Sequence, residues 1–403
     1  MSVFDAVIGQ PSTVAELARA TRAAADVVAG RPVQPGAFAH AWLFTGPAGS
    51  GRSVAARALA AALQCDLADQ LAQAGQTPGC GQCPSCRSVL AGTHRDVQWV
   101  ETEGLSLGVD LMREVVASAA RQPTLGRWQV VIVSDADRLG ERASNTVLKA
   151  IEEPSPRTVF LLCAPSTHPD DVIVTIRSRC RVVGLRIPPT GAVADVLRAE
   201  GVADGIATWA AQAAQGHVGR ARRLARDDQA RQRRAAVLAI PASLTSLNAC
   251  FEAAEHLVRA SEAEAKALTE GLNETETDEL KVALGAGGTG KGAATAARGS
   301  AGAIKDLEKR QKSRLTRLQR DALDRALVDL ASFYRDVLLA QAGSSVAAAH
   351  PDFARAVAQV AQVLDPAGAL RRLDDVLACR QAIELNVKPR IAVEAMTAGL
   401  CLP

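Results

Sequence analysis

The first half of the chain alternates short apolar runs with segments of helical periodicity. Residues 41–45 form an apolar run, which is followed by a glycine-rich turn and by helical spacing over residues 54–59. Two further runs, residues 130–133 and 159–162, are short, apolar and flanked by polar residues, as is typical of buried parallel strands. Strands that alternate with helices over residues 1–185 predict an α/β domain with right-handed crossovers.

The second half of the chain carries no comparable strand signal. Residues 186–238 predict a few short helices, which together make a small lid domain. Residues 239–403 predict a larger all-helical domain. Within it, Gly, Ala, Ser and Thr crowd out large apolar side chains over residues 285–303, so this stretch is expected to be a flexible insertion.

Composition supports a globular protein of two to three domains. The chain has 403 residues, of which 48% are hydrophobic and 22% charged, enough apolar surface to form a sizeable core. Its net charge of +3 is too small to indicate nucleic-acid binding by itself. No basic leader followed by an apolar run and no run of 18 apolar residues is present, so we expect a cytoplasmic protein without a membrane partner.

A candidate phosphate-binding loop follows the first apolar run. Residues 46–53 match the pattern G-x-x-x-x-G-K-[ST] except that arginine replaces the lysine. Glycines let backbone N–H groups turn toward phosphate, the serine would hold Mg²⁺, and the longer, planar guanidinium fits the loop less well than an ammonium. An ordinary glycine-rich turn and a loop without hydrolytic activity are the alternatives. The candidate nucleotide-binding residues in this loop are Gly46, Gly49, Gly51, Arg52 and Ser53.

The acidic motif that would complete an ATPase site is degraded. Ser134, Asp135 and Asp137 follow the run at residues 130–133. If Ser134 takes the magnesium-binding position and Asp135 that of the catalytic Glu, the first has lost its charge and the second is one methylene short. Asp137, two residues further along a strand end, is not expected to substitute, because its side chain would face another way. Hydrolysis should be weak or absent, ATP and Mg²⁺ binding stays open, and turn or cap roles are the alternative.

Four cysteines form the pattern C-x14-C-x2-C-x2-C. Four thiolates at this spacing can close a tetrahedral Zn²⁺ site, and a closed shell leaves no position for reactive water. Such a metal would be structural and would staple residues 65–96 to the fold, with free thiols or a redox pair as alternatives. The candidate zinc ligands are Cys65, Cys80, Cys83 and Cys86.

Together with these motifs, three further segments resemble bacterial DNA polymerase III clamp-loader subunits of the AAA+ class. They are residues 3–10 (VFDAVIGQ), residues 145–154 (NTVLKAIEEP) and residues 178–180 (SRC), in the order of that family. The resemblance covers residues 3–185 and implies an α/β AAA+ domain with a zinc insertion. A helical lid and an all-α collar domain would follow, and the match there is loose.

Within that family the departures favour a delta-prime-like stator over an ATP-hydrolysing gamma/tau-like subunit. Arg52, Ser134 and Asp135 all depart toward lost catalysis, whereas the Ser-Arg-Cys motif is intact. The resemblance implies that Arg179 reaches the γ-phosphate bound by the adjacent subunit and stabilises its developing charge. An ordinary salt bridge is the alternative for Arg179, because Arg177 shows how rich in arginine the segment is.

The resemblance also implies the partners. They would be gamma/tau and delta subunits, the sliding clamp, and primer-template DNA reached through the assembled complex. The basic clusters at residues 220–226 and 309–317 would be solvated helix faces or non-specific phosphate contacts. The chain is expected to serve as a subunit of the polymerase assembly and to have little catalytic activity alone. An autonomous ATPase and a purely structural zinc module are the rival functions.

Overall fold

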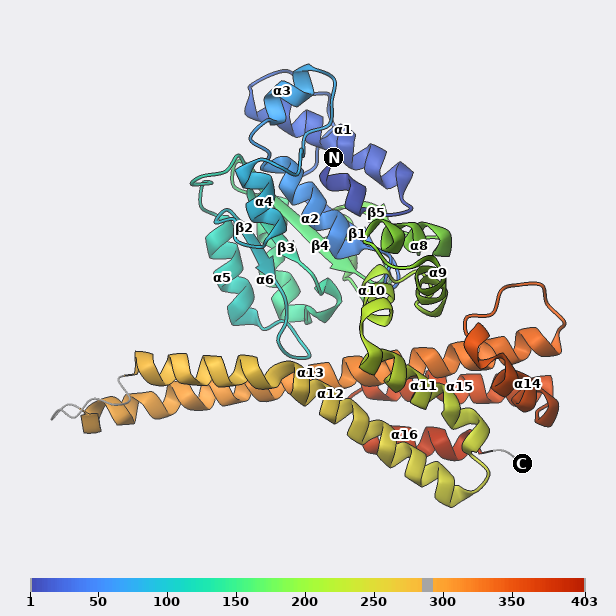
Figure 1. Cartoon of the computed structure of the whole chain (residues 1–403). Coiled ribbons are helices and arrows are strands. Elements are labelled where there is room, and N and C mark those ends of the chain that lie inside the picture. Colours follow the sequence, from blue (N-terminus) through green and yellow to red (C-terminus); the bar gives the residue numbers. More distant parts are fainter. Residues whose placement is uncertain (1, 285–292, 402–403) are drawn as a thin grey trace. The chain divides into compact units, whose positions relative to one another are not determined.

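The computed structural model describes residues 2–284 and 293–401, without the side chains of residues 293–301. The chain divides into two compact units, Met1–Ala225 and Arg226–Pro403 (Figure 1). The α/β elements lie in the first unit, and the second is helical. The domain boundaries predicted at residues 185 and 238 stay a prediction, because the structure divides the chain at a single point, after Ala225.

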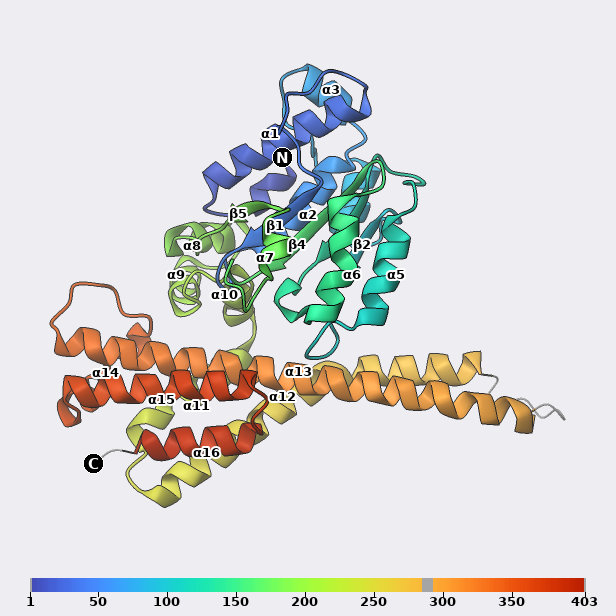
Figure 2. The ribbon, with the colours of Figure 1, turned by 180° about the vertical axis from the view of Figure 1, so that it is seen from behind.

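A five-stranded parallel sheet forms the centre of the first unit (Figure 2). Its strands are β1 (Ala41–Thr45), β2 (Val97–Val100), β3 (Gln129–Val133), β4 (Thr158–Ala164) and β5 (Arg181–Gly184). Their spatial order is β2-β3-β4-β1-β5, so β1 lies between β4 and β5, with Ala41 opposite Phe160. The three apolar runs predicted as strands are β1, β3 and β4, and every residue of these strands is buried.

Alternation along the strands divides the core of this unit into two layers. Trp42 and Phe44 face the core that α1 and α2 cover, whereas Leu43 and Phe160 face the core under α5 and α6. Burial on both faces explains why the strands read as continuous apolar runs. The helices of this part are α1 (Pro11–Val28), α2 (Arg52–Leu63), α3 (Ala68–Gln73), α4 (Pro84–Leu90), α5 (Val109–Ala119), α6 (Glu141–Glu152) and α7 (Val174–Arg177), with 3-10 turns η1 (Val3–Ala6) and η2 (Ala136–Arg138).

Three short helices follow β5, as the sequence predicts for the lid region. They begin after the pair Pro188 and Pro189, and the left-handed residues Gly201 (φ 84°) and Gly216 (φ 84°) separate them. Positive φ at both breaks favours glycine, which pays no steric penalty there. The helices are α8 (Thr190–Ala199), α9 (Asp204–Ala213) and α10 (Val218–Arg226).

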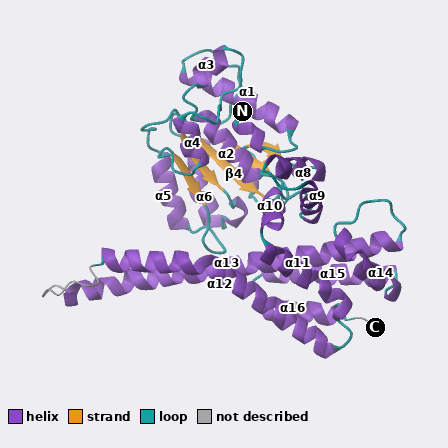
Figure 3. Ribbon diagram, viewed as in Figure 1, coloured by secondary structure: helices purple, strands orange, loops and turns teal. Residues whose placement is uncertain are grey.

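The second unit consists of helices around one apolar core (Figure 3). Phe333 and Tyr334, with ring centroids 5.7 Å apart, are fully buried within it. A polar cluster lies alongside, in which the buried Arg234 contacts Nδ1 of the buried His350 at 2.7 Å and the carboxylate of the exposed Asp352 at 2.6 Å. The elements are α11 (Asp228–Ser243), α12 (Leu247–Ala283), α13 (Ala293–Gln341), η3 (Pro351–Phe353), α14 (Ala354–Val363), α15 (Pro366–Glu384) and α16 (Pro389–Gly399).

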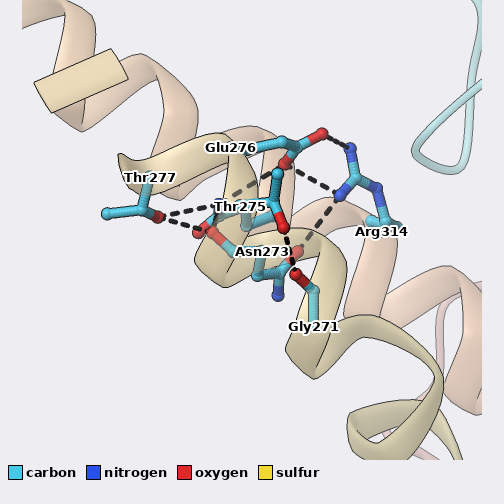
Figure 4. A network of polar contacts seen from close by, with 7 residues as sticks. Gly271, Asn273, Thr275, Glu276, Thr277 and Arg314 are labelled. Atoms are coloured by element: carbon cyan, nitrogen blue, oxygen red, sulfur yellow. Dashed lines mark hydrogen bonds and ion pairs between the residues drawn. The ribbon is translucent and has the colours of Figure 1, made fainter. Parts of the chain in front are cut away.

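Helices α12 and α13 form a long antiparallel hairpin within this unit (Figures 1 and 2). Near its far end, Arg314 donates hydrogen bonds to both carboxylate oxygens of Glu276, at 3.0 and 2.8 Å, and to Asn273 Oδ1 at 3.1 Å (Figure 4). Of the insertion predicted to be flexible, residues 285–292 lie outside the described residues, and residues 293–303 belong to the start of α13.

Within the described part of the chain, none of the helices combines the length and the apolar character needed to cross a membrane.

Candidate nucleotide, metal and arginine sites

The phosphate-loop motif joins the carboxyl end of β1 to the first turn of α2. Gly46, Gly49 and Gly51 adopt φ of 151°, 87° and 91°, which L side chains rarely allow. A Cβ on Gly46 would lie 2.6 Å from Ser50 Oγ, and one on Gly49 would lie 2.8 Å from the Cβ of His217 at the start of the lid helix α10. The loop therefore needs glycine at these positions, and part of its backbone is covered by the lid.

Three buried polar atoms around this loop have no hydrogen-bond partner among the described residues. They are Ser50 Oγ in the loop, Arg52 Nη1 in the first turn of α2, and Ser134 Oγ directly after β3. An unsatisfied buried polar atom costs about 1–3 kcal/mol, so such atoms suit a polar ligand or ordered water. These residues are compatible with phosphate, although Ser134 brings no carboxylate that could hold Mg²⁺.

Asp137 was expected at a strand end, but the structure places it elsewhere. It lies in the 3-10 turn η2 and not on a strand end. Burial raises the pKa of Asp137 and the nearby charge of Asp135 adds to the rise, while Arg138 and Arg52 oppose it. The charge of Arg52 thus forms part of the electrostatic environment of the partly buried Asp137.

The four predicted zinc ligands converge. Their sulfur atoms all lie within 4.8 Å of one another, and Cys65 Sγ is 3.8 Å from Cys80 Sγ. A tetrahedral zinc with Zn–S of about 2.3 Å has an S–S edge of about 3.8 Å. Backbone N–H groups point at the sulfurs, with Cys83 N donating to Cys80 Sγ and Cys86 N donating to Cys83 Sγ, both at 3.4 Å. This donor set fits a structural Zn²⁺ ion, and a closed Cys₄ shell has no open coordination position.

His94 lies close in sequence but does not join the metal-binding set. Its Nδ1 accepts the N–H of Asp96 at 3.1 Å, and burial lowers the pKa of the imidazole. Burial would also raise the pKa of Asp96, but hydrogen bonds from Thr124, Gly126 and Leu125 lower it instead. His94 and Asp96 thus stabilise the segment that joins the cysteine module, residues 65–96, to β2.

Arg179 lies in the turn between α7 and β5, and its side chain is 39% exposed. Its Nε forms an ion pair with Glu152 Oε1 at 2.5 Å, and its Nη1 donates to Thr175 O at 3.0 Å. The ordinary salt bridge that the sequence analysis gave as the alternative for Arg179 is thus present. None of the hydrogen bonds or ion pairs of Arg179 among the described residues is with the phosphate loop.

The neighbouring arginines of the same segment have structural partners. Arg181 pairs with Glu16 Oε1 at 2.7 Å, and its guanidinium lies 5.2 Å from the ring centroid of the buried Trp42. Arg177 donates to Thr167 O at 3.2 Å. Arg181 is therefore tied to the core beside the edge strand, whereas Arg179 projects from a turn.

The sheet order, the glycine-rich loop after β1 and the helical lid after β5 define an AAA+ domain with a four-cysteine insertion. Sequence comparison narrows this class. A family model described as "DNA polymerase III, delta subunit" matches residues 28–189. The similarity to DNA polymerase III subunits therefore lies in the first unit and covers less than half of the chain.

Two curated relatives illustrate the match. The DNA polymerase III subunit delta' of Pseudomonas aeruginosa is 38% identical over 160 residues, which are 39% of this chain and 46% of that protein. The subunit gamma/tau of Mycobacterium tuberculosis is 34% identical over 187 residues, 46% of this chain and 29% of that protein. The chain thus spans less than half the length of these relatives.

A solved structure is also similar. A gamma subunit-related protein of Thermotoga maritima is 15% identical with a TM-score of 0.42, over 94% of this chain and 97% of that chain.

Proposed function

We propose that this chain is a delta-prime-type stator of a bacterial DNA polymerase III clamp loader. It would work in the cytoplasm with gamma/tau and delta subunits to place the sliding clamp on primer-template DNA. In this role it supplies Arg179 to ATP bound by a neighbouring subunit and hydrolyses little ATP itself. The observation that carries the proposal is that Arg179 is exposed and makes no contact with its own phosphate loop.

The candidate nucleotide site of this chain also supports a role in which a neighbouring subunit hydrolyses ATP and this chain does not. Ser134 has no carboxylate for Mg²⁺, and Asp135 is one methylene shorter than the glutamate that polarises water in an ATPase. The charge of Arg52 also acts on the partly buried carboxylate of Asp137. A site of this kind can retain phosphate contacts from the loop backbone while it lacks the groups that drive hydrolysis.

The metal has a separate, structural role. A Zn²⁺ ion held by Cys65, Cys80, Cys83 and Cys86 would fix the insertion against the sheet and take no part in phosphoryl transfer. The insertion also contacts the start of the chain, because Val3 N donates to Gly79 O at 2.9 Å.

The test is clamp- and DNA-stimulated ATP hydrolysis by gamma/tau plus delta subunits, with this protein, its Arg179→Ala variant, or no addition. The wild type should stimulate turnover, and Arg179→Ala should lose at least about tenfold of that stimulation, because a trans arginine is worth orders of magnitude in rate. Arg177→Ala, two residues away and also exposed, is the matched control. Equal activity of Arg179→Ala, or equally fast hydrolysis by this chain alone, contradicts the proposal.

A further inference from the structure

The partner of Arg179 comes from another element of the same unit. Glu152 is the last residue of α6, and its carboxylate pairs with Arg179 across 27 positions of sequence, with Nε and Oε1 2.5 Å apart. Both side chains are partly exposed, 39% for Arg179 and 43% for Glu152. An ion pair so open to water contributes about 0–1 kcal/mol to folding. The ion pair between Arg179 and Glu152 therefore adds little to the free energy of unfolding.

The contacts of the guanidinium involve Nε and Nη1 and leave Nη2 without a hydrogen bond among the described residues. Arginine carries five N–H donors. Nε faces Glu152, while Nη1 donates to Thr175 O at 3.0 Å and to Ser178 Oγ at 3.2 Å. Nη2 donates no hydrogen bond to any residue that the structure describes. Two N–H groups are thus free to meet an incoming oxyanion without breaking the existing contacts.

A guanidinium fixed before its anion arrives loses less side-chain entropy on binding than a freely rotating one. Among the described residues, the carboxylate of Glu152 is the one charged group that pairs with Arg179, and its nearest contact is with Nε. It therefore restricts the long side chain, while Nη2 forms no hydrogen bond with a described residue.

We propose that Glu152 is a positioning residue for Arg179. Its carboxylate, with the carbonyl of Thr175, orients the guanidinium so that Nη2 is presented to the terminal phosphate of a nucleotide on the neighbouring subunit. This inference rests on the proposed function, because it assigns to Glu152 a part in the same trans contact. Glu152 itself touches neither nucleotide nor reacting atoms.

The experiment uses the assembled complex and measures kcat and the KM for ATP of stimulated hydrolysis. Glu152→Ala should lower kcat about three- to tenfold with the KM changed less than about twofold, because misorientation affects the charge that develops in the transition state. Glu152→Gln keeps the shape of the side chain and loses its charge, so its kcat should lie between those of the wild type and Glu152→Ala. Glu153→Gln removes an equal charge from the adjacent residue, whose side chain forms no hydrogen bond or ion pair with a described residue, and should match the wild type.

A double-variant cycle separates positioning from a general structural effect. In the Arg179→Ala background, Glu152→Ala should cause no further loss of kcat, because Glu152 acts only through the guanidinium. The thermal midpoint of Glu152→Gln should stay within about 1 °C of the wild type. Because Glu152→Gln is nearly isosteric, it carries the test if Glu152→Ala assembles poorly.

The outcomes that overturn the inference differ from those that overturn the function. A rise in kcat in Glu152→Ala would show that Glu152 competes with phosphate for Arg179. An unchanged kcat in both Glu152 variants, with Arg179→Ala inactive, would remove Glu152 from the site and leave the function standing. If Arg179→Ala itself has no effect, the proposed function fails.

Discussion

The carboxylate of Asp69 accepts two hydrogen bonds from the guanidinium of Arg127, at 2.7 and 2.8 Å. Asp69 lies on α3 inside the cysteine module (residues 65–96), and Arg127 lies just before the strand β3. The hydrogen bond from Arg127 lowers the pKa of Asp69, so the pair is charged at neutral pH. This two-point contact links the module to the sheet independently of any metal.

Arg127→Ala should let the module open more often. With one side chain 18% and the other 41% exposed, the pair contributes about 1 kcal/mol, which corresponds to an approximately fivefold change in a rate or equilibrium. We expect a chelator to remove zinc about fivefold faster from Arg127→Ala, followed with a colorimetric zinc indicator. Arg121→Ala removes an exposed arginine that forms no ion pair with any residue the structure describes, and is the control. Identical release rates in all three proteins would exclude this link.

Cysteine substitution should remove the metal. The purified protein is expected to hold one zinc per chain by elemental analysis, and Cys86→Ser should reduce this severalfold, because the Cys86 side chain is fully buried and cannot be replaced by water. Loss of zinc should lower the thermal midpoint by about 5 °C or more. Cys401→Ser, far from the module in sequence, should retain full zinc content. A Cys86→Ser protein with undiminished zinc would disprove the Cys₄ site.

Arg52→Lys should not restore ATP hydrolysis by the isolated chain. Lysine returns the compact ammonium of the phosphate-loop pattern, but Ser134 still offers no carboxylate to Mg²⁺ and Asp135 remains short. Release of ADP should therefore stay at background in Arg52→Lys. The combined variant Arg52→Lys, Ser134→Asp and Asp135→Glu is the informative comparison. Turnover gained by Arg52→Lys alone would mean that the arginine was the main defect.

The helical hairpin should weaken in acid through Glu276. The hydrogen bond from Arg314 holds the pKa of Glu276 below its usual value of 4.5. A depressed carboxyl pKa stabilises the folded state above about pH 4.5, and that stability is lost as pH falls through the folded pKa. Glu276→Gln should thus exchange amide hydrogens faster than the wild type in α12 and α13 at pH 7, by about fivefold for a loss of about 1 kcal/mol.

The difference between the two proteins should shrink below about pH 4, once exchange is corrected for its intrinsic pH dependence. Glu279→Gln removes a nearby carboxylate that has no ion pair within the described part of the chain, and should exchange like the wild type. A difference that is equally large at pH 7 and below pH 4 would rule out Glu276 as the titrating group.

The sequence predicted those features that local pattern determines. β1, β3 and β4 are buried on both faces, so each is a continuous apolar run. β2 and β5 lie at the two edges of the sheet and are only partly buried, so their residues give no comparable signal and were not predicted. The four cysteines were found because three of them lie within a single turn-rich stretch.

Contacts between distant segments could not be read from the same patterns. The pairing of Arg179 with Glu152 depends on how α6 and the turn after α7 pack, and nothing in either segment specifies the partner. The position of Asp137 was missed for a related reason. Period-two alternation applies only within a strand, and the chain leaves the strand for a 3-10 turn directly before this residue.

The hairpin of α12 and α13 changes its construction along its length. With 37 residues, α12 is about 55 Å long. Its buried residues end at Thr269. Beyond that point Arg314 and Gln311 form hydrogen bonds to α12, and Leu307 is the one fully described apolar side chain of α13 that is buried there. In mechanical terms the hairpin is stiff at its root and compliant at its tip. We expect a force applied at the tip to break the hydrogen bonds of Arg314 and Gln311 before it disturbs the packing of Phe333 and Tyr334.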